Sequence, residues 1–299
     1  MLAAKPGRVT SARARNPWWF LLPAAGVYAF VLVVPNFQAM AYSFTNWDGL
    51  SEGFNFVGFD NYIRTFADPQ FGSSLAHTLV LTAEVAVLQL TGGLLLALAL
   101  HSRVKSRNIL RVVFFTPVVL TAVSVGYIWR YIYAPTGALN QVLADVGLEG
   151  LRRDWLGDPS INLTAIAIIV VWQGIGFTMV IFLAGLQGIP DEVIEAGHLD
   201  GANGLQRFWF VTRPMLAPVL LVNAVLAVMG GLKIFDQIFV TTQGGPAYTT
   251  ATLATLTYTD GFVNGNYSFG VTLSIVLALL IAVVTLIQYR IMQGRPDHE

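Results

Sequence analysis

Few residues in the long apolar stretches of this sequence have the types and spacing that acid–base or ligand chemistry requires. Glu84 lies in such a stretch, two helical turns from His77 on the same face. A carboxylate there is either part of a proton or ion relay or the partner of a neighbouring helix. Because a relay needs several ionisable groups and this stretch offers one, we favour structural pairing. Lys233 and Asp236, three residues apart, are expected to pair with each other.

The sequence lacks the residue patterns that most classes of enzyme require. The sequence has no cysteine, no Gly-x-Ser-x-Gly nucleophile turn and no pair of histidines at metal-binding spacing. It also has no Gly-x-x-x-x-Gly-Lys-Ser/Thr run, so the chain is not expected to bind a nucleotide through a P-loop. We therefore predict no catalytic residue, no metal site and no enzymatic activity.

The segment 188–214 is the most unusual part of the chain outside the apolar stretches. Pro190 suits the first position of a helix, and the two acidic residues that follow suit the positive end of its dipole. This helix is expected to end at Asp200-Gly201, where glycine permits a left-handed turn. A second short helix is expected from Asn203 to Pro214. Such a helix pair would expose apolar residues that a mere connection does not need, which favours a docking surface.

The elements that must position these residues follow from composition. Apolar residues make up 55% of the 299 residues, charged residues only 11%, and the mean hydropathy is +0.63. Soluble domains carry about 25% charged residues because their surface faces water, so a lipid bilayer is expected to cover this chain. The net charge is zero, which gives no argument for binding nucleic acid.

Stretches of about 20 apolar residues are long enough to cross the bilayer as helices. Six stretches qualify, at about residues 18–39, 75–100, 112–132, 163–186, 216–238 and 271–292. We therefore predict an all-α integral membrane protein with one six-helix domain over 18–299. Residues 1–17 are expected to form a loosely held basic tail. Residues 41–74 and 133–162, rich in glycine, aspartate, asparagine and aromatic residues, are expected to form ordered caps.

Lysines and arginines fix the orientation, because they accumulate on the cytoplasmic side. One set of connections and ends carries twelve of them: Lys5, Arg8, Arg13, Arg15, Arg103, Lys105, Arg107, Arg111, Arg207, Arg213, Arg290 and Arg295. The alternate connections carry three: Arg64, Arg152 and Arg153. Both termini and the segment 188–214 are therefore predicted to be cytoplasmic.

Two motifs carry a resemblance to a known family. Glu195-Ala196-Gly197, followed after three residues by Gly201 and later by Pro214, is similar to the EAA loop of permease subunits of ABC importers. The run 241–246, Thr-Thr-Gln-Gly-Gly-Pro, resembles the maltose-type branch of sugar permeases. Three positions depart from the motif, namely Gly197 for alanine, Val211 for isoleucine and Arg213 for leucine. Glycine at 197 weakens the helix by up to about 1 kcal/mol relative to alanine.

The resemblance implies the type I ABC importer permease fold and a set of partners. These are a second, paralogous permease, a cytoplasmic ATPase dimer, an extracytoplasmic sugar-binding lipoprotein, the sugar itself and the lipid bilayer, with no nucleic acid. ATP and Mg²⁺ would be bound by the ATPase, so no cofactor is expected on this chain. The implied location is the plasma (inner) membrane of a bacterium or archaeon, with several crossings. Binding-protein-dependent carbohydrate import is the implied activity.

The resemblance also implies two sets of site residues. Coupling to the ATPase is expected at Glu195, Ala196, Gly197, Asp200, Gly201 and Ala202. Sugar contacts near mid-membrane are expected at Trp172, Gln173, Gly174, Phe177, Asn223, Gly230 and Gly231. Amide groups, an aromatic face and the space left by glycines suit a sugar, although Trp172 and Phe177 equally suit ordinary lipid or helix packing. The choice among sugars, polyols and glycerol phosphates stays open.

A different class of protein, an ion-coupled secondary transporter, is the alternative. Such transporters have charged mid-membrane sites and broken helices within inverted repeats. Glu84 is the feature that favours this alternative, whereas the motif at Glu195 would have no role in it.

Overall fold

A computed structural model describes residues 18–102 and 105–293. Within those residues the chain is helical, and its one pairing of extended backbone is an isolated bridge between Thr45 and Phe56. The basic tail 1–17 lies outside the described residues, as do Arg103 and Arg295.

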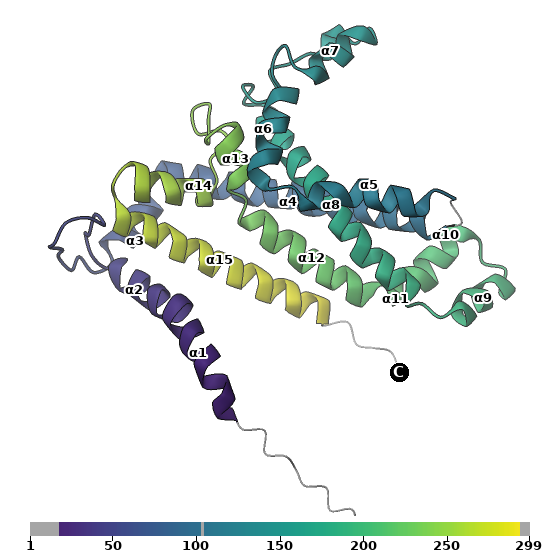
Figure 1. The fold of residues 1–299 in the computed structure, drawn as a ribbon, viewed down its shortest axis with the longest axis horizontal. Coiled ribbons are helices and arrows are strands. Elements are labelled where there is room, and N and C mark those ends of the chain that lie inside the picture. Colours follow the sequence, from purple (N-terminus) through teal and green to yellow (C-terminus); the bar gives the residue numbers. More distant parts are fainter. Residues whose placement is uncertain (1–17, 103–104, 294–299) are drawn as a thin grey trace, which may run out of the picture.

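Four helices of the described part are long and apolar enough to cross a membrane alone. The first runs over Trp19–Tyr42, through α1 (Leu22–Tyr28), a π-helical turn (Ala29–Val33) and α2 (Val34–Tyr42). The others are α4 (Pro69–His101), α8 (Asn162–Gln187) and α15 (Tyr267–Gln293). Figure 1 shows α4, α8, α12 and α15 side by side in one bundle, while α1 diverges from it.

Two further helix pairs qualify as spans only when each bent pair is counted as one. The helices α5 (Arg107–Val119) and α6 (Ala122–Ile132) meet at 103°, and the segment Gly204–Met215 meets α12 (Ala217–Leu232) at 71°. Counted this way, the described residues hold up to six spans, in agreement with the predicted number.

The third span was expected as one helix over about 112–132, and its division into two helices at a sharp bend is a correction. Pro117 lies inside α5 and has no backbone N–H to donate, which weakens the helix near its end. Leu120 is extended, and the Thr121 hydroxyl then accepts from the Ser124 N–H (3.3 Å), which starts α6 as a new helix.

The fifth span was expected over 216–238, but α12 ends at Leu232 and a separate helix, α13, covers Asp236–Thr241. Lys233 follows the helix and Asp236 begins the next, so the two are not on one helical face. The expected ion pair between them is wrong, because they form none within 4.0 Å.

Short helices lie around the bundle (Figure 1). At one end lie α3 (Asp60–Ala67) and α14 (Leu253–Tyr258), and at the other end lie α9 (Asp191–Leu199), α10 (Gly204–Arg207) and α11 (Arg213–Met215). Helix α7 (Ala138–Asp145) stands apart from the bundle, beyond α6. Hydrogen bonds order the segments around α3 and α7. The Asn61 amide donates to the carbonyls of Ser43 and Thr45 (2.8 Å each), and Asn140 accepts from the Trp155 indole (3.0 Å).

Asp48 illustrates the order of the 41–59 segment. Its carboxylate accepts from the Ser51 hydroxyl, the Ser51 backbone N–H and the Leu50 backbone N–H. These bonds stabilise the ionised form, and they lower the pKa of Asp48 to about 2.

The core of the bundle is the contact between α4 and α8. Their buried residues include Leu81, Val85, Ile166 and Ile169 toward one end, and Ala97, Met179, Phe182 and Leu186 toward the other. The two helices approach closely at Gly93, where a Cβ atom would lie 2.6 Å from the Thr178 side chain. Small residues permit this approach in membrane helices, where packing is the main source of association.

Gly176 gives a stability prediction for this packing. A Cβ atom at Gly176 would overlap the Phe114 carbonyl oxygen and approach the Phe115 Cα to 2.9 Å, so backbone would have to move. We expect Gly176→Ala to separate α5 from α8 and to destabilise the protein by about 1–3 kcal/mol. Thermal unfolding in detergent measures the change. Gly72→Ala is the matched control, because a Cβ atom there meets nothing within 4 Å; equal melting temperatures for both variants would contradict the prediction.

Candidate functional site

A cavity of about 350 Å³ lies between α4, α8 and α12 at mid-span. Helix α8 contributes Gln173, Gly174 and Phe177, α12 contributes Asn223, and α4 contributes Gln89. The structure therefore brings four of the expected sugar contacts together at one place. Three of the lining side chains are amides, in a cavity that is otherwise largely apolar.

Hydrogen bonds to neighbouring elements, mostly to their backbone carbonyls, hold the amides in place. Gln173 donates to the Leu120 carbonyl (3.0 Å) at the α5–α6 bend and accepts from the Gln237 amide (2.9 Å). Gln89 donates to the Val170 carbonyl (3.4 Å), and Asn223, which is 2% exposed, donates to the Thr178 carbonyl (3.5 Å). Each amide thus keeps hydrogen-bonding capacity for a hydroxyl-bearing ligand.

A second cavity of about 200 Å³ continues the first, with Gln89, Leu226 and Ala227 lining both. The α12–α13 break lines it, through Gly230, Gly231, Lys233, Phe235, Asp236 and Gln237. We call the two together the inner cavity. Helix α12 ends at Leu232 beside this cavity, and residues on both sides of that end line it.

The three glycines line the inner cavity, but only Gly230 leaves open space there, and Trp172 lies outside the cavity. Gly174 makes room for the Gln89 amide, which a Cβ atom would overlap, and Gly231 lets α12 approach α4 at Thr82, 2.8 Å from a Cβ position. Gly230 faces open space within the cavity. Trp172 packs edge-on against Trp129, with ring centroids 5.6 Å apart, and lines neither part of the inner cavity.

Gln89 is a site residue that sequence reasoning missed. Its signal was present, because it is an amide in an otherwise apolar span and so needs a partner at membrane depth. Gln237 was missed for another reason, since it was taken as the end of a span and not as part of a break.

The helix pair of segment 188–214 connects the C-terminal end of α8 to the N-terminal end of α12. Helix α9 covers Asp191–Leu199, and Gly201 follows with a φ of +76°. Asn203 and Gln206 then form a capping box that begins α10. The bounds and the left-handed glycine agree with the sequence expectation.

Contacts within this pair fix the geometry between its two helices. The Arg207 guanidinium donates to the Ala202 carbonyl (3.0 Å) and lies 2.9 Å from His198 Nδ1. Gly197 is buried against Arg207 and Val211, where a Cβ atom would lie at 3.6 Å, an ordinary contact distance. The glycine is therefore not required for space.

The remaining surface of the pair is exposed. Glu195, Ala196 and Asp200 are exposed, Ala202 is half-buried, and a Cβ atom at Gly201 would meet nothing within 4 Å. Apolar side chains accompany them, with Leu199 89%, Leu205 70% and Phe210 79% exposed. An apolar patch around a carboxylate is typical of a protein-binding surface.

Glu84 lies half-buried on α4 against α8. Its Oε1 accepts from the Thr164 hydroxyl (3.0 Å), while Oε2 is buried without a hydrogen-bond partner. His77 does not join it, because its Nδ1 lies 3.1 Å from the Ala251 carbonyl. The contact to a neighbouring helix fits structural pairing.

For Glu84→Gln we expect uptake within about twofold of the wild type, because the amide still accepts from Thr164. Thr164→Val should instead lower stability by about 1 kcal/mol, because it leaves the carboxylate without a donor. Vesicle uptake and thermal unfolding measure the two effects. Loss of uptake in a folded Glu84→Gln protein would support an ion relay.

Among the described residues no three of the histidines and carboxylates gather closely enough to hold a metal ion. The arrangement provides a polar cavity at mid-span and an exposed helix pair at one end, joined by α8 and α12. These features suit passage and gating of a solute.

Comparisons with known proteins agree with this arrangement. The family model described as "Binding-protein-dependent transport system inner membrane component" matches residues 89–295. The multiple sugar-binding transport system permease protein of Streptococcus mutans is 34% identical over 274 residues, covering 92% of this chain and 94% of that protein. The lactose transport system permease protein of Rhizobium radiobacter is 30% identical over 278 residues, covering 92% and 93%.

A solved structure shares the fold. It is a chain of a bacterial ABC transporter involved in the import of the acidic polysaccharide alginate, with a TM-score of 0.81 at 22% identity, over 94% of this chain and 96% of that one.

Proposed function

Because this chain belongs to the family of binding-protein-dependent transport system inner membrane components, we propose that it forms one half of the transmembrane pathway of an ATP-driven sugar importer. It is a multi-pass membrane protein with a transport role. The partners in the proposal are a second, paralogous permease, a cytoplasmic ATPase dimer that binds ATP and Mg²⁺, and an extracytoplasmic sugar-binding lipoprotein. This assembly would lie in the plasma membrane of a bacterium or archaeon.

The observation that carries the proposal is the connection between the inner cavity and the helix pair. Helix α8 bears Gln173 and, after Gly188–Pro190, leads directly into α9 with Glu195. Helix α12, which bears Asn223, follows directly on α11 at the other end of the pair. One end of each cavity-lining helix, the C-terminus of α8 and the N-terminus of α12, therefore lies at the same exposed helix pair.

This connection suggests how ATP hydrolysis acts at a distance. Gln173 and Gln187 on α8 are separated by about 21 Å of helix, and a helix moves as a rigid element. Closure of the ATPase dimer would displace α9, and α8 and α12 would move with it and open the inner cavity to the outside. This is rigid-body switching between two packed states.

Sugar is the proposed substrate class for two reasons. Amide groups that retain hydrogen-bonding capacity line the inner cavity, beside the aromatic ring of Phe177. The relatives named above transport sugars according to their names. Polyols and glycerol phosphates offer hydroxyl groups of the same kind.

Reconstitution tests the proposal. The chain, its partner permease and the ATPase are placed in liposomes with ATP inside, and the binding protein with radiolabelled maltose, lactose or raffinose is added outside. We expect uptake that requires ATP and the binding protein and is indifferent to a proton uncoupler. Uptake that an uncoupler abolishes and that ignores ATP would establish the ion-coupled alternative. Ligand binding to the purified binding protein identifies the solute and separates sugars from polyols and glycerol phosphates.

A further inference from the structure

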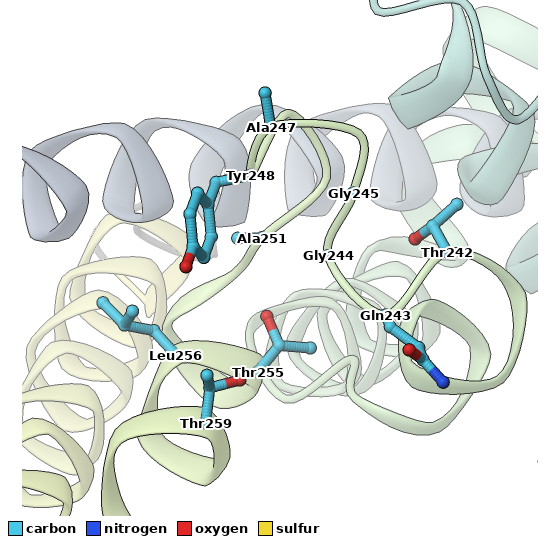
Figure 2. A pocket seen from close by; sticks show the side chains of 10 residues that line it. All are labelled: Thr242, Gln243, Gly244, Gly245, Ala247, Tyr248, Ala251, Thr255, Leu256 and Thr259. Atoms are coloured by element: carbon cyan, nitrogen blue, oxygen red, sulfur yellow. The ribbon is translucent and has the colours of Figure 1, made fainter. Parts of the chain in front are cut away.

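A third cavity, of about 330 Å³, lies at the other side of the bundle from α9 and has no role in the function proposed so far. We call it the loop pocket. It lies beside the connection between α13 and α14, and its lining includes Gln243, Tyr248, Thr255, Leu256 and Thr259. In Figure 2 Tyr248 and Leu256 lie on one side and Gln243 on the other, with Thr255 between them. The distribution of lysines and arginines places this side outside the cell.

The backbone of this connection is held in an unfavourable conformation. Gln243, Ala247 and Tyr248 have φ values of +52°, +46° and +63°, although none of them is a glycine. Residues with side chains rarely adopt this region, and such residues cluster at ligand-binding and switching sites.

Hydrogen bonds maintain that conformation. The Thr250 hydroxyl donates to the Gly245 carbonyl (3.0 Å) and lies 2.7 Å from the Thr242 hydroxyl. The connection is also attached to the long helices, because Asn162 of α8 donates to Thr249 (2.8 Å) and His77 of α4 contacts the Ala251 carbonyl (3.1 Å). The pocket is therefore preformed, and binding would cost little ordering of the loop.

The lining side chains match the surface of a neutral sugar. Tyr248 is 47% exposed and presents an aromatic ring, which suits the C–H face of a sugar ring. The side chains of Gln243 and Thr259 make no hydrogen bond to the residues that the structure describes, so an amide and a hydroxyl are available as donors and acceptors. None of the ten lining residues is charged, which disfavours an anionic ligand.

The loop pocket and the inner cavity are neighbours along the chain. Gln237 lines the inner cavity and Thr242 the loop pocket, at the two ends of α13, about 8 Å of helix apart. The rings of Phe235, Phe239 and Tyr258 form a cluster, with centroids 5.0–5.4 Å apart: the two phenylalanines stack, and Tyr258 lies edge-on to Phe239. Phe235 itself lines the inner cavity, and in the sequence Tyr258 directly precedes Thr259, which lines the loop pocket.

We infer that the loop pocket is an outer sugar-binding site, which takes a neutral sugar from the binding protein before it enters the inner cavity. This inference rests on the proposed function and extends it. The pocket would prevent the released sugar from escaping to the medium during the switch to the outward-open state. Its loss would therefore lower the number of sugars imported per ATP hydrolysed, without weakening the contact with the binding protein.

The test uses the complete reconstituted transporter with radiolabelled maltose, lactose and raffinose. The variants Tyr248→Leu and Thr259→Val remove the ring and the hydroxyl, and Tyr248→Phe retains the ring. Leucine and phenylalanine carry a Cβ atom as tyrosine does, so neither substitution relieves the backbone strain at position 248. Tyr289→Leu is the matched control, since Tyr289 is 46% exposed and lies on α15 away from the pocket.

We expect Tyr248→Leu and Thr259→Val to lower uptake by about fivefold, the effect of losing about one hydrogen bond or ring contact. ATP hydrolysis stimulated by the loaded binding protein should stay at the wild-type rate, so ATP consumed per sugar rises by the same factor. Tyr248→Phe and Tyr289→Leu should stay close to the wild type.

Two results would overturn the inference. Unchanged uptake in both pocket variants would show that the pocket binds no sugar during transport. A parallel fall of uptake and ATP hydrolysis, with more binding protein needed for half-maximal stimulation, would show that the loop binds that protein instead. Failure of the proposed function gives a different result, because wild-type uptake would then ignore ATP and be abolished by a proton uncoupler.

Discussion

We expect uptake to fall at least about tenfold when Glu195 is replaced by glutamine, and the melting temperature of the protein to stay unchanged. Glu195 is exposed on α9, and its carboxylate makes no hydrogen bond to any residue that the structure describes. Its removal therefore takes nothing from the fold of this chain. A charge-assisted hydrogen bond to the ATPase contributes about 1.5–3 kcal/mol, and its loss corresponds to a factor of about ten or more.

The measurement compares uptake, ATP hydrolysis and thermal unfolding in the same preparation. Glu149→Gln is the matched control, because Glu149 is also exposed in a short helical turn but belongs to a connection that the distribution of lysines and arginines predicts on the opposite side of the membrane. We expect this control to transport normally. Normal uptake by Glu195→Gln would remove Glu195 from the coupling surface, and a lower melting temperature would give it a folding role instead.

Gly174→Leu should also reduce uptake at least about tenfold, by closing the inner cavity. Gly174 faces the cavity and leaves the space that the Gln89 amide occupies, so any larger side chain displaces Gln89. Leucine also replaces polar lining with apolar surface, which leaves the hydroxyl groups of a sugar without partners. An unpaired polar group costs about 1–3 kcal/mol, and two or more groups are affected.

Two measurements separate this effect from misfolding. ATP hydrolysis by the assembled complex reports that the variant has folded and joined its partners. Gly72→Leu is the control, because Gly72 on α4 faces open space and lines neither part of the inner cavity. If Gly174→Leu imports sugar at the normal rate, the inner cavity is not on the pathway.

The number of apolar spans could be predicted from the sequence, and their direction is predicted from it as well, because membrane insertion depends on local properties. A stretch of about 20 apolar residues is stable in lipid whatever its neighbours are, and lysines and arginines orient it. The signals for the helix Asp191–Leu199 are also local, because Pro190 precedes its first residue and the left-handed Gly201 follows its end. These features require no knowledge of what packs against them.

The bends within the spans could not be predicted from the hydropathy of the sequence, for a physical reason. Hydropathy sums over a window and is the same for a straight helix and for one broken at Leu120 or Lys233. The break at Lys233 is supported by contacts with distant elements, such as the Thr252 hydroxyl that donates to the Ile234 carbonyl (3.2 Å). At membrane depth such distant groups satisfy the backbone that a broken helix exposes.

The sequence by itself thus determined the class of protein, the number of its apolar spans and the exposed helix pair around Glu195, and it predicts the orientation in the membrane. Only the tertiary structure decided which polar residues share a cavity. Gln89 meets the backbone of Val170, 81 residues away, because α4 and α8 pack along their lengths, whereas Trp172, next to Gln173 in sequence, packs elsewhere on Trp129. Adjacent residues on a helix point in directions about 100° apart, so the choice of neighbouring helix, and not sequence proximity, determines which side chains line the pathway.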